Sequence, residues 1–416
     1  MKRPGISYGW LVVAAGFILT LTGYAVRNTF TVFYPVIVED FFWSRGVTAI
    51  MYSLTMVSYG IVAPVAGGLV DRFNPKLVFS AGGLVIGGGI ALCSLATATW
   101  HFYLFYGVMV ATGLSMIGFT PLSSIITHWF LERRALVFGL LGAGYGVSLI
   151  SAPLFQYLIS EYGWRAAYLI TGTAAALIII PFAIFVIKRK PGTGHGAQTT
   201  TDMGDATSDQ VADAAKSADW TIKSALTTRT YKLQLAMSFL NIGFAQGVSV
   251  AHLVYFFRDA GFAPMTAASI FSLYGLGFVV GNLTSGLSDR FGRARIFVPT
   301  TLLAAVGIGM MHFVNDAMSP IVPSIGTLLL GYGLGICAPT CYAGIADCFH
   351  GRNYGSIQGT AILAMSMGAA VGPWLGGALH DFTGTYTTTF LLSQVALVLA
   401  ALLMAIANPR AGVPPR

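Results

Sequence analysis

Arg27 lies in the stretch GYAVRNTF and follows sixteen residues, Leu11 to Val26, that carry no charge. A charged side chain in the middle of a membrane span costs at least about 2.5 kcal/mol, and it usually faces a bundle interior or a water-filled cavity. A guanidinium can hold a carboxylate with two parallel hydrogen bonds. Arg27 therefore indicates a binding site for an organic anion. The alternatives are pairing with a protein carboxylate, an outward reach to the lipid headgroups, and a gating role.

Carboxylates that would pair with Arg27 are missing from the middle of the predicted spans. The acidic residues of the apolar regions lie at span ends, at Glu39, Asp40, Asp71, Asp289, Asp347 and Asp381. Because no Asp or Glu lies in the middle of a span, an ordinary carboxylate proton carrier is also missing. His252 is then the proton-coupling candidate, because histidine changes charge near neutral pH. A histidine that only packs helices, cotransport without a dedicated carrier, and anion exchange are the alternatives.

The composition of the 416-residue chain indicates its class. It is 55% hydrophobic and only 9% charged, whereas soluble domains are about 25% charged. We therefore expect an integral membrane protein. Four cysteines lie in or at the end of apolar runs, at Cys93, Cys337, Cys341 and Cys348. Free cysteine usually behaves as a small hydrophobe, so we expect no metal site and no cofactor.

Twelve apolar runs are long enough for a bilayer, which needs about 20 residues per helix. We expect spans at 9–38, 46–70, 77–98, 101–128, 136–160, 165–187, 232–257, 265–288, 296–315, 319–346, 354–379 and 385–407. A polar stretch after the sixth span is typical of a flexible linker, with a short helix from about Thr221 to Thr228. The predicted domains are a six-helix bundle at 1–187, a cytoplasmic linker at 188–230 and a second six-helix bundle at 231–416.

Basic residues are unequally divided between the two sides of the membrane. Nineteen of the 23 Lys and Arg fall at the termini or in loops on the same side, whereas Arg45, Arg165 and Arg258 fall in the opposite loops. Because cytoplasmic loops carry the excess of Lys and Arg, we expect both termini in the cytoplasm and the protein in the cell inner membrane. The net charge of +8 reflects this topology and calls for no nucleic-acid partner.

The two halves of the chain are internal copies. Asp71 and Asp289 are 218 residues apart, and Pro153 and Pro373 are 220 apart. A constant offset predicts two six-helix bundles related by a pseudo-twofold axis along the membrane normal. Parallel repeats of this kind place a substrate site between the halves, near the bilayer midplane, and alternate its access by rocking.

The offset also suggests which residues share that site. It places Gln246 opposite Arg27, and Met365 opposite Tyr145. The predicted substrate-binding residues are Arg27, Asn28, Tyr24, Phe119, Tyr145, Gln246, Tyr274, Phe278, Asn282, Tyr332 and Met365. For each aromatic residue alone, core or lipid packing is the simpler role.

The stretch GGLVDRFNPK resembles the signature loop of the major facilitator superfamily, G-x-x-x-D-R-x-G-x-[RK]. The matching residues are Gly67, Asp71, Arg72 and Lys76, and the copy SGLSDRFGRAR contributes Asp289 and Arg290. Asn74 replaces the later glycine of the motif, and asparagine tolerates the left-handed turn expected there. We interpret the motif as a conformational latch, with Asp71 facing a helix N-terminus or a basic partner in the other half.

Further stretches, among them YAVRNTFTVFYP, WFLERRALVFGLLGAGYG and HLVYFFRDAGF, resemble the monocarboxylate transporters and their bacterial oxalate–formate relatives. The resemblance covers nearly the whole chain except the linker. It implies an all-α major facilitator fold and secondary transport of a small organic anion, such as a lactate- or pyruvate-like acid. The expected mechanism is alternating access, by proton symport or by anion exchange.

Two departures from that family pattern affect the expected substrate. A family lysine falls on Asn28, and a substrate-binding arginine of the eighth span falls on Asn282. The pair of cations that oxalate transporters carry is also missing, so a monoanion is favoured over a dianion. The alternative function is export of lipophilic or drug-like compounds. An enzyme is not expected, and we expect a monomer whose partners are the solute, protons and the bilayer.

Overall fold

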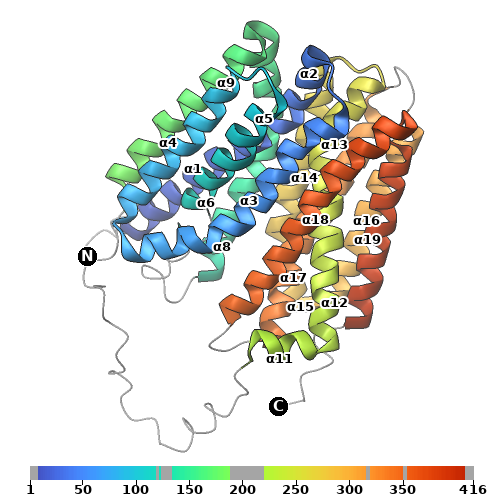
Figure 1. Ribbon diagram of the computed structural model, residues 1–416. Coiled ribbons are helices and arrows are strands. Elements are labelled where there is room, and N and C mark those ends of the chain that lie inside the picture. Colours follow the sequence, from blue (N-terminus) through green and yellow to red (C-terminus); the bar gives the residue numbers. More distant parts are fainter. Residues whose placement is uncertain are drawn as a thin grey trace, which may run out of the picture.

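The computed structural model of the chain describes residues 8–118, 121–122, 134–187, 220–314, 319–349 and 354–407. In these ranges the regular structure is helical (Figure 1). Eleven helical segments are long and apolar enough to cross a membrane. One of them, Leu140–Phe185, is broken at Gly163, where φ is 76° and ψ is 159°. Because a residue of positive φ interrupts a helix, this segment contains two spans, which agrees with the twelve that the sequence predicts.

The first half of the chain contains the first six spans. Its helices are α1 (Tyr8–Asn28), α2 (Phe30–Phe41), α3 (Arg45–Arg72), α4 (Pro75–Cys93), α5 (Thr99–Phe102), the π-helical η1 (Tyr103–Val110), α6 (Ala111–Ile117), α8 (Arg134–Ile150) and α9 (Ala152–Phe185). The first span is formed by α1 and α2 together, which meet at Thr29, where the backbone stays helical with φ −53° and ψ −28°. Arg27 and Asn28 lie directly before this junction.

The second half contains the other six spans. Its helices are α11 (Ile222–Thr227), α12 (Arg229–Met237), the π-helical η2 (Ser238–Ala245), α13 (Gln246–Asp259), α14 (Pro264–Thr284), α15 (Leu287–Phe291), α16 (Arg293–Gly309), the 3₁₀-helical η3 (Met310–Phe313), α17 (Ile321–Phe349), α18 (Tyr354–Thr383) and α19 (Thr387–Ala407). The short helix α11 confirms the one expected near Thr221.

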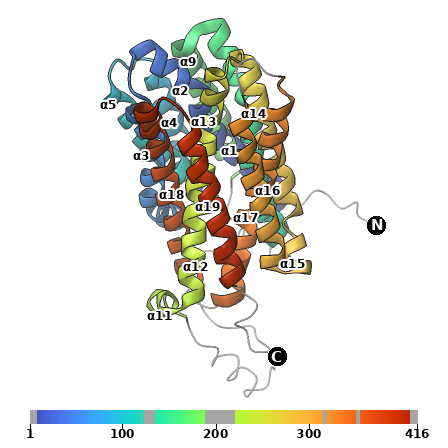
Figure 2. The ribbon, with the colours of Figure 1, turned by 90° about the vertical axis from the view of Figure 1, so that its right-hand side faces the viewer.

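Two helix pairs make the most extensive contacts between the halves in the described ranges. The contacts run between α3 and α18 and between α8 and α14, and both views show α3 beside α18 (Figures 1 and 2). These helices supply the second, eleventh, fifth and eighth spans. The repeat maps the second span onto the eighth and the eleventh onto the fifth, so one contact is the symmetry copy of the other. This arrangement agrees with the predicted pseudo-twofold axis.

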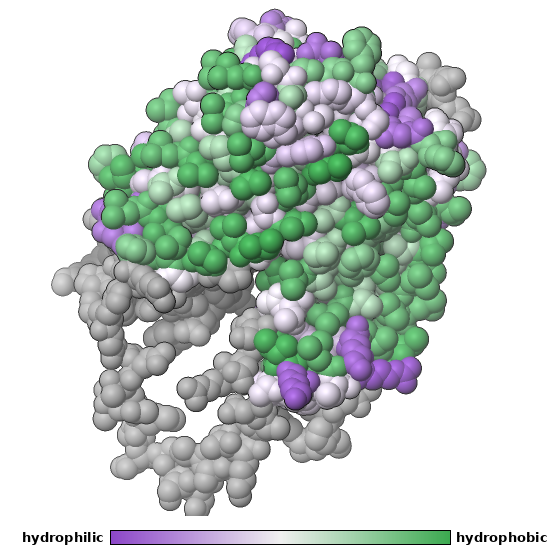
Figure 3. All heavy atoms as spheres, viewed as in Figure 1, coloured by the Kyte–Doolittle hydropathy of each residue, from purple (hydrophilic) through white to green (hydrophobic). Residues whose placement is uncertain are grey.

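The two ends of the helices differ. Tyr8 donates a hydrogen bond to the carbonyl of Val186, 2.9 Å away, so the start of α1 lies beside the end of the sixth span. We call this the linker end, and we call the end that carries Arg45 and Asp259 the distal end. Hydrophobic side chains cover the flank of the molecule, and hydrophilic ones gather toward the ends (Figure 3). Such an apolar belt suits a protein that spans a bilayer.

The expected left-handed turn at Asn74 is wrong. Asn74 has φ −65° and ψ 122° and forms the N-cap of α4, where its side-chain oxygen accepts a hydrogen bond from the backbone N–H of Lys76 at 3.1 Å. In the second copy, Gly292 has φ 106°. The two copies of the loop therefore end differently, because a capping side chain stabilises the turn in one and a glycine permits it in the other.

The latch residues are only partly described. The surroundings of Gly67 and the side chains of Asp71 and Arg72 lie outside the described part of the structure. In the second copy, Asp289 pairs with Arg293 at 2.5 Å. Arg293 also binds Asp347 of α17 at 2.8 Å, so these contacts lie within the second half. Arg290 is exposed, with its guanidinium 5.6 Å from the ring of Phe291. A latch role for the motif stays a prediction.

Candidate functional site

Arg27 lies in the last turn of α1 and is 7% exposed. Its backbone carbonyl accepts a hydrogen bond from the hydroxyl of Tyr106, which lies in η1 and is fully buried. The junction with α2 at Thr29 follows two residues later. This end of α1 is therefore anchored to the fourth span, and its guanidinium projects inside the protein.

The guanidinium of Arg27 is surrounded by aromatic rings. Its carbon Cζ lies 4.8 Å from the ring centroid of Tyr24 and 5.2 Å from that of Tyr145. The hydroxyl of Tyr52 in α3 also lies within electrostatic range. Arg27 Nε is buried and has no hydrogen-bond partner in the described ranges. Cation–π contacts stabilise such a charge by about 0.5–2 kcal/mol each, but they leave its N–H groups unsatisfied.

Tyr145 connects Arg27 with the second half. Its hydroxyl accepts a hydrogen bond of 2.8 Å from the side-chain amide of Gln246. Its ring meets those of Tyr24 and Phe278 edge to face, each at a centroid distance of 5.1 Å. Residues from the first, fifth, seventh and eighth spans thus converge on Tyr145, and Gln246, which the repeat offset placed opposite Arg27, is linked to Arg27 through that tyrosine.

The side chain of Asn28 contacts α8, as that of Arg27 does. Its amide Nδ2 donates to Ser148 Oγ at 2.8 Å, and Ser148 Oγ donates to the carbonyl of Tyr145 at 2.6 Å. Asn28 is 4% exposed, and its Oδ1 has no partner among the described residues. A buried donor and a buried acceptor, Arg27 Nε and Asn28 Oδ1, therefore lie on neighbouring residues, and neither has a partner in the part of the chain that the structure describes.

The remaining predicted site residues lie at varying distances from this cluster. Tyr274 is fully buried, with its ring 6.1 Å from that of Phe278 and its hydroxyl unpartnered in the described chain. Asn282 donates to the carbonyl of Phe278, one turn earlier in its own helix, at 3.3 Å. Met365 Sδ accepts a hydrogen bond from Tyr342, and Tyr332 packs its backbone against Gly277 and Gly281. Phe119 lies outside the described residues.

Two residues of the aromatic lining, Tyr52 and Tyr106, were not predicted from the sequence. Each is 2% exposed or less. Tyr106 lies among several other tyrosines and phenylalanines in the stretch HFYLFYG, and Tyr52 shares its span with Tyr59. No pattern within those spans separates the rings that face Arg27 from the rings that pack against lipid.

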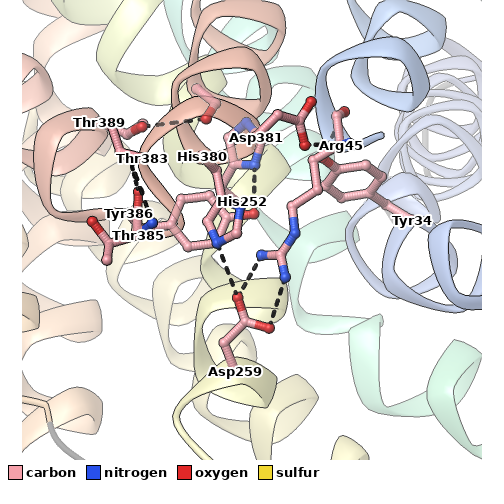
Figure 4. A network of polar contacts seen from close by, with 11 residues as sticks. Tyr34, Arg45, His252, Asp259, His380, Asp381, Thr383, Thr385, Tyr386 and Thr389 are labelled. Atoms are coloured by element: carbon pink, nitrogen blue, oxygen red, sulfur yellow. Dashed lines mark hydrogen bonds and ion pairs between the residues drawn. The ribbon is translucent and has the colours of Figure 1, made fainter. Parts of the chain in front are cut away.

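A second polar cluster lies at the distal end and joins the halves through Arg45 (Figure 4). Its guanidinium binds both carboxylate oxygens of Asp259, one of them at 3.0 Å, and lies 3.6 Å from the ring centroid of Tyr255. His380 Nε2 approaches Asp259 at 3.7 Å. We call Arg45, Asp259, His380, Asp381 and Tyr386 the distal network. From the sequence, Arg45 was predicted only to lie in a loop on the side opposite the termini.

Asp381 contributes to this network by capping a helix of the other half. Its two oxygens accept hydrogen bonds from the backbone N–H groups of Arg45, at 2.8 Å, and of Gly46, at 2.7 Å. These are the first residues of α3, so the carboxylate satisfies unpaired donors and lies at the positive end of the helix dipole. A Cβ at Gly377 would lie 2.8 Å from backbone atoms of Arg45, so glycine permits this close approach of α18 to α3.

His252 lies between the distal network and the arginine site on α13, where it is fully buried. Its Nε2 is 2.8 Å from the carbonyl oxygen of Pro373, and its Nδ1 is 3.3 Å from the hydroxyl of Tyr386. A carbonyl only accepts, so Nε2 carries the proton and Nδ1 accepts from Tyr386. Burial raises the pKa of Tyr386, which keeps that hydroxyl a donor.

The sequence matches the Major Facilitator Superfamily over residues 16–286 and again over residues 234–415. Curated proteins that it resembles include monocarboxylate transporter 13 of Rattus norvegicus, 26% identical over 95% of this chain and 88% of that one. Monocarboxylate transporter 3 of Rattus norvegicus is 28% identical over 97% of this chain and 80% of that one. Monocarboxylate transporter 11 of Homo sapiens is 26% identical over 98% and 84%.

Among solved structures, the chain resembles a bacterial homologue of the human lysosomal transporter Spinster. The inward-facing, unoccupied form of that protein superposes with a TM-score of 0.67 at 16% identity, and the match covers 97% of this chain and 96% of that one. Its inward-facing, occupied form gives a TM-score of 0.64 at 15% identity. At this identity the likeness shows the fold.

Proposed function

The chain belongs to the major facilitator superfamily and is a transport protein rather than an enzyme, and we propose that it carries a small monocarboxylate across the cytoplasmic membrane by alternating access. Relatives named monocarboxylate transporters over nearly the whole chain support this substrate class. The proposed moving bodies are residues 1–187 and 231–416, joined by the linker 188–230. The excess of Lys and Arg on the linker side supports a cytoplasmic location for both termini.

The observation that carries the proposal is the Nε of Arg27, which is buried and unsatisfied among the described residues. Tyr145, whose ring lies beside the guanidinium, accepts a hydrogen bond from Gln246 of the second half. Leaving a charged donor unsatisfied in a membrane protein is costly, so retention of the arginine is explained if a solute supplies the negative charge. A carboxylate matches the planar guanidinium better than other common anions of this size.

The charge balance around Arg27 favours a monoanion. No second Lys, Arg or acidic side chain interacts with its guanidinium in the described ranges. A single cation compensates one negative charge, whereas a second carboxylate would remain unpaired inside the protein. The rings of Tyr24, Tyr145 and Phe278 would then pack against the apolar part of the acid.

The distal network supports a conformation closed at the distal end. It ties Arg45 and Gly46 of the first half to Asp259 and Asp381 of the second. Opening that end would have to break an ion pair and remove the cap of α3, whereas the arginine site is linked to the second half by the weaker contact between Tyr145 and Gln246. We propose that these contacts separate when the site opens outward.

His252 is the proposed proton-coupling residue. Its Nδ1 is the basic nitrogen of the imidazole, and the hydroxyl of Tyr386, which donates to it, leads toward the distal network. Tyr34 faces the imidazole ring at 5.7 Å, and Arg45, His380 and Asp381 lie within electrostatic range. Binding a proton at Nδ1 would reverse its hydrogen bond with Tyr386, which links protonation to the network that closes the distal end.

The proposal is tested by thermal unfolding of the purified protein with a panel of monocarboxylates, dicarboxylates, organic cations and lipophilic compounds. A monocarboxylate at 100 times its Kd stabilises the folded protein by about 2.7 kcal/mol. We expect Arg27→Gln to remove this stabilisation, because the amide carries no charge. The control is Arg295→Gln, which removes an exposed arginine outside the site and should keep it.

Two results would contradict the proposal in different ways. Equal stabilisation of wild type and Arg27→Gln by the same acid would remove Arg27 from the site. Stabilisation by lipophilic compounds, with none by any carboxylate, would favour the exporter alternative.

A further inference from the structure

The orientation of the Asn28 amide follows from its neighbours. Ser148 has one hydroxyl proton, and the 2.6 Å contact directs it to the carbonyl of Tyr145, which cannot donate. Toward Asn28, Ser148 Oγ must then accept, so the group that faces it at 2.8 Å is Nδ2 and not the oxygen. The Oδ1 of Asn28 therefore points away from Ser148. It is buried and has no donor among the described residues.

The unsatisfied atoms around Arg27 are of two kinds. Arg27 Nε is a donor without an acceptor, and Asn28 Oδ1 is an acceptor without a donor. They belong to consecutive residues, and the side chains of both contact α8, at Tyr145 and Ser148. The two atoms do not pair with each other. A carboxylate alone would satisfy only the first of them.

The missing donor is better supplied by a hydroxyl group than by an ammonium group. An ammonium beside Arg27 would need an acidic partner, and no Asp or Glu interacts with Arg27 in the described chain. A hydroxyl on the carbon next to the carboxylate donates one hydrogen bond and adds no charge. A keto group at the same position offers only another acceptor, which would face Asn28 Oδ1 unfavourably.

We propose that Asn28 determines specificity by accepting a hydrogen bond from a hydroxyl group of the solute, so that the preferred substrate is a 2-hydroxy monocarboxylate. This inference rests on the proposed function, because it assumes that Arg27 holds the carboxylate. Ser148 acts as a positioning residue, since its hydrogen bond fixes which end of the Asn28 amide faces the solute.

The test compares three acids that differ only at the second carbon: lactate, pyruvate and propanoate. Their apparent Kd values are measured by thermal shift, and by competition with uptake of labelled lactate into proteoliposomes. We expect wild type to bind lactate about three- to tenfold more tightly than propanoate, as one added hydrogen bond allows, and to bind pyruvate no more tightly than propanoate. This comparison needs no variant.

Two variants then test which residues cause the preference for lactate over propanoate. Asn28→Leu removes the acceptor at similar volume and should bring the lactate-to-propanoate ratio to about one. Ser148→Ala leaves Asn28 in place but frees its amide to rotate, so the ratio should fall while propanoate binding stays. Arg27→Gln should abolish binding of all three acids.

The outcomes separate this inference from the proposed function. Equal binding of the three acids by wild type, or tighter binding of pyruvate, would overturn the role of Asn28 while Arg27 kept its own. A lactate preference that persists in Asn28→Leu would do the same. Failure of all three acids to bind, or unchanged binding by Arg27→Gln, would overturn the proposed function and this inference with it.

Discussion

Arg27 and Arg45 belong to the same half of the molecule and are both largely shielded from solvent, yet their surroundings differ. The side chain of Arg45 is 15% exposed, and its guanidinium binds both oxygens of Asp259 and stacks on Tyr255. Arg27 is 7% exposed and faces the rings of Tyr24 and Tyr145, with no ion pair among the described residues. One charge is satisfied by the protein, and the other is the one that we propose a ligand satisfies.

The difference separates a structural role from a binding role. A buried ion pair loses stability when one partner is removed, because the other charge stays behind uncompensated. An unpaired buried cation has the opposite effect, since the folded protein carries its desolvation cost until an anion arrives. The two arginines should therefore respond to substitution with opposite signs of stability change.

The largest stability effect is expected for Arg45→Gln. It leaves Asp259 without its arginine partner, whereas the backbone N–H of residue 45 still donates to Asp381. Because Asp259 is 35% exposed, the loss should fall below the 3–5 kcal/mol of a fully buried pair. We expect the free energy of unfolding to fall by about 2 kcal/mol, measured by denaturant unfolding in detergent.

Arg258→Gln is the matched control for this prediction. It breaks a distal ion pair with Glu39, whose side chain is 53% exposed. Pairs of that kind contribute about 0–1 kcal/mol. If Arg45→Gln proved no more destabilising than Arg258→Gln, the distal network would not hold the two halves together as proposed.

A smaller effect of opposite sign is expected for Arg27→Leu in the absence of ligand. Removing the charge recovers at least about 2.5 kcal/mol of desolvation. It also loses two cation–π contacts, and because these are long, at 4.8 and 5.2 Å, each is placed in the lower part of its range, at about 0.5–1 kcal/mol. The ligand-free protein should become more stable by about 1 kcal/mol, seen as a higher Tm, while losing all stabilisation by carboxylates. A lower Tm for Arg27→Leu would mean that the protein itself satisfies Arg27.

Of the two regions, only the surroundings of Arg27 could be predicted from the sequence. The twelve spans follow from hydropathy, and Arg27 is conspicuous because it is the one basic residue of 23 that lies away from the termini and loops. Gln246 was placed near Arg27 by the repeat alone. Each of these predictions uses information that is local in the chain or is duplicated in it.

The distal network could not be predicted from the sequence, because it depends on how distant helices pack together. Asp259 and Asp381 are 122 residues apart, and in the sequence each is one of several acids at a span end. Only the approach of α18 to α3 brings Asp381 to the N-terminus of a helix from the other half. The same limit applies to Tyr52 and Tyr106, since hydropathy does not tell which face of a span turns toward Arg27. The turn at Asn74 was predicted wrongly because its capping hydrogen bond is equally compatible with asparagine.

The smallest expected effect concerns His252, which lies between the two regions. In wild-type proteoliposomes, an inward gradient of half a pH unit should raise accumulation of a transported monocarboxylate about threefold, if one proton accompanies each anion. His252→Gln offers an amide to the carbonyl of Pro373 but cannot bind a proton, so the gradient should have no effect on it while anion exchange at equal pH continues. The control is His101→Gln, at the start of a span, where the ring accepts a hydrogen bond from Ala98 N–H at 3.1 Å. This variant should keep the threefold response.

A response retained by His252→Gln would mean that another residue couples transport to protons. No response in wild type would favour anion exchange, and the buried imidazole would then only pack between α13 and α18.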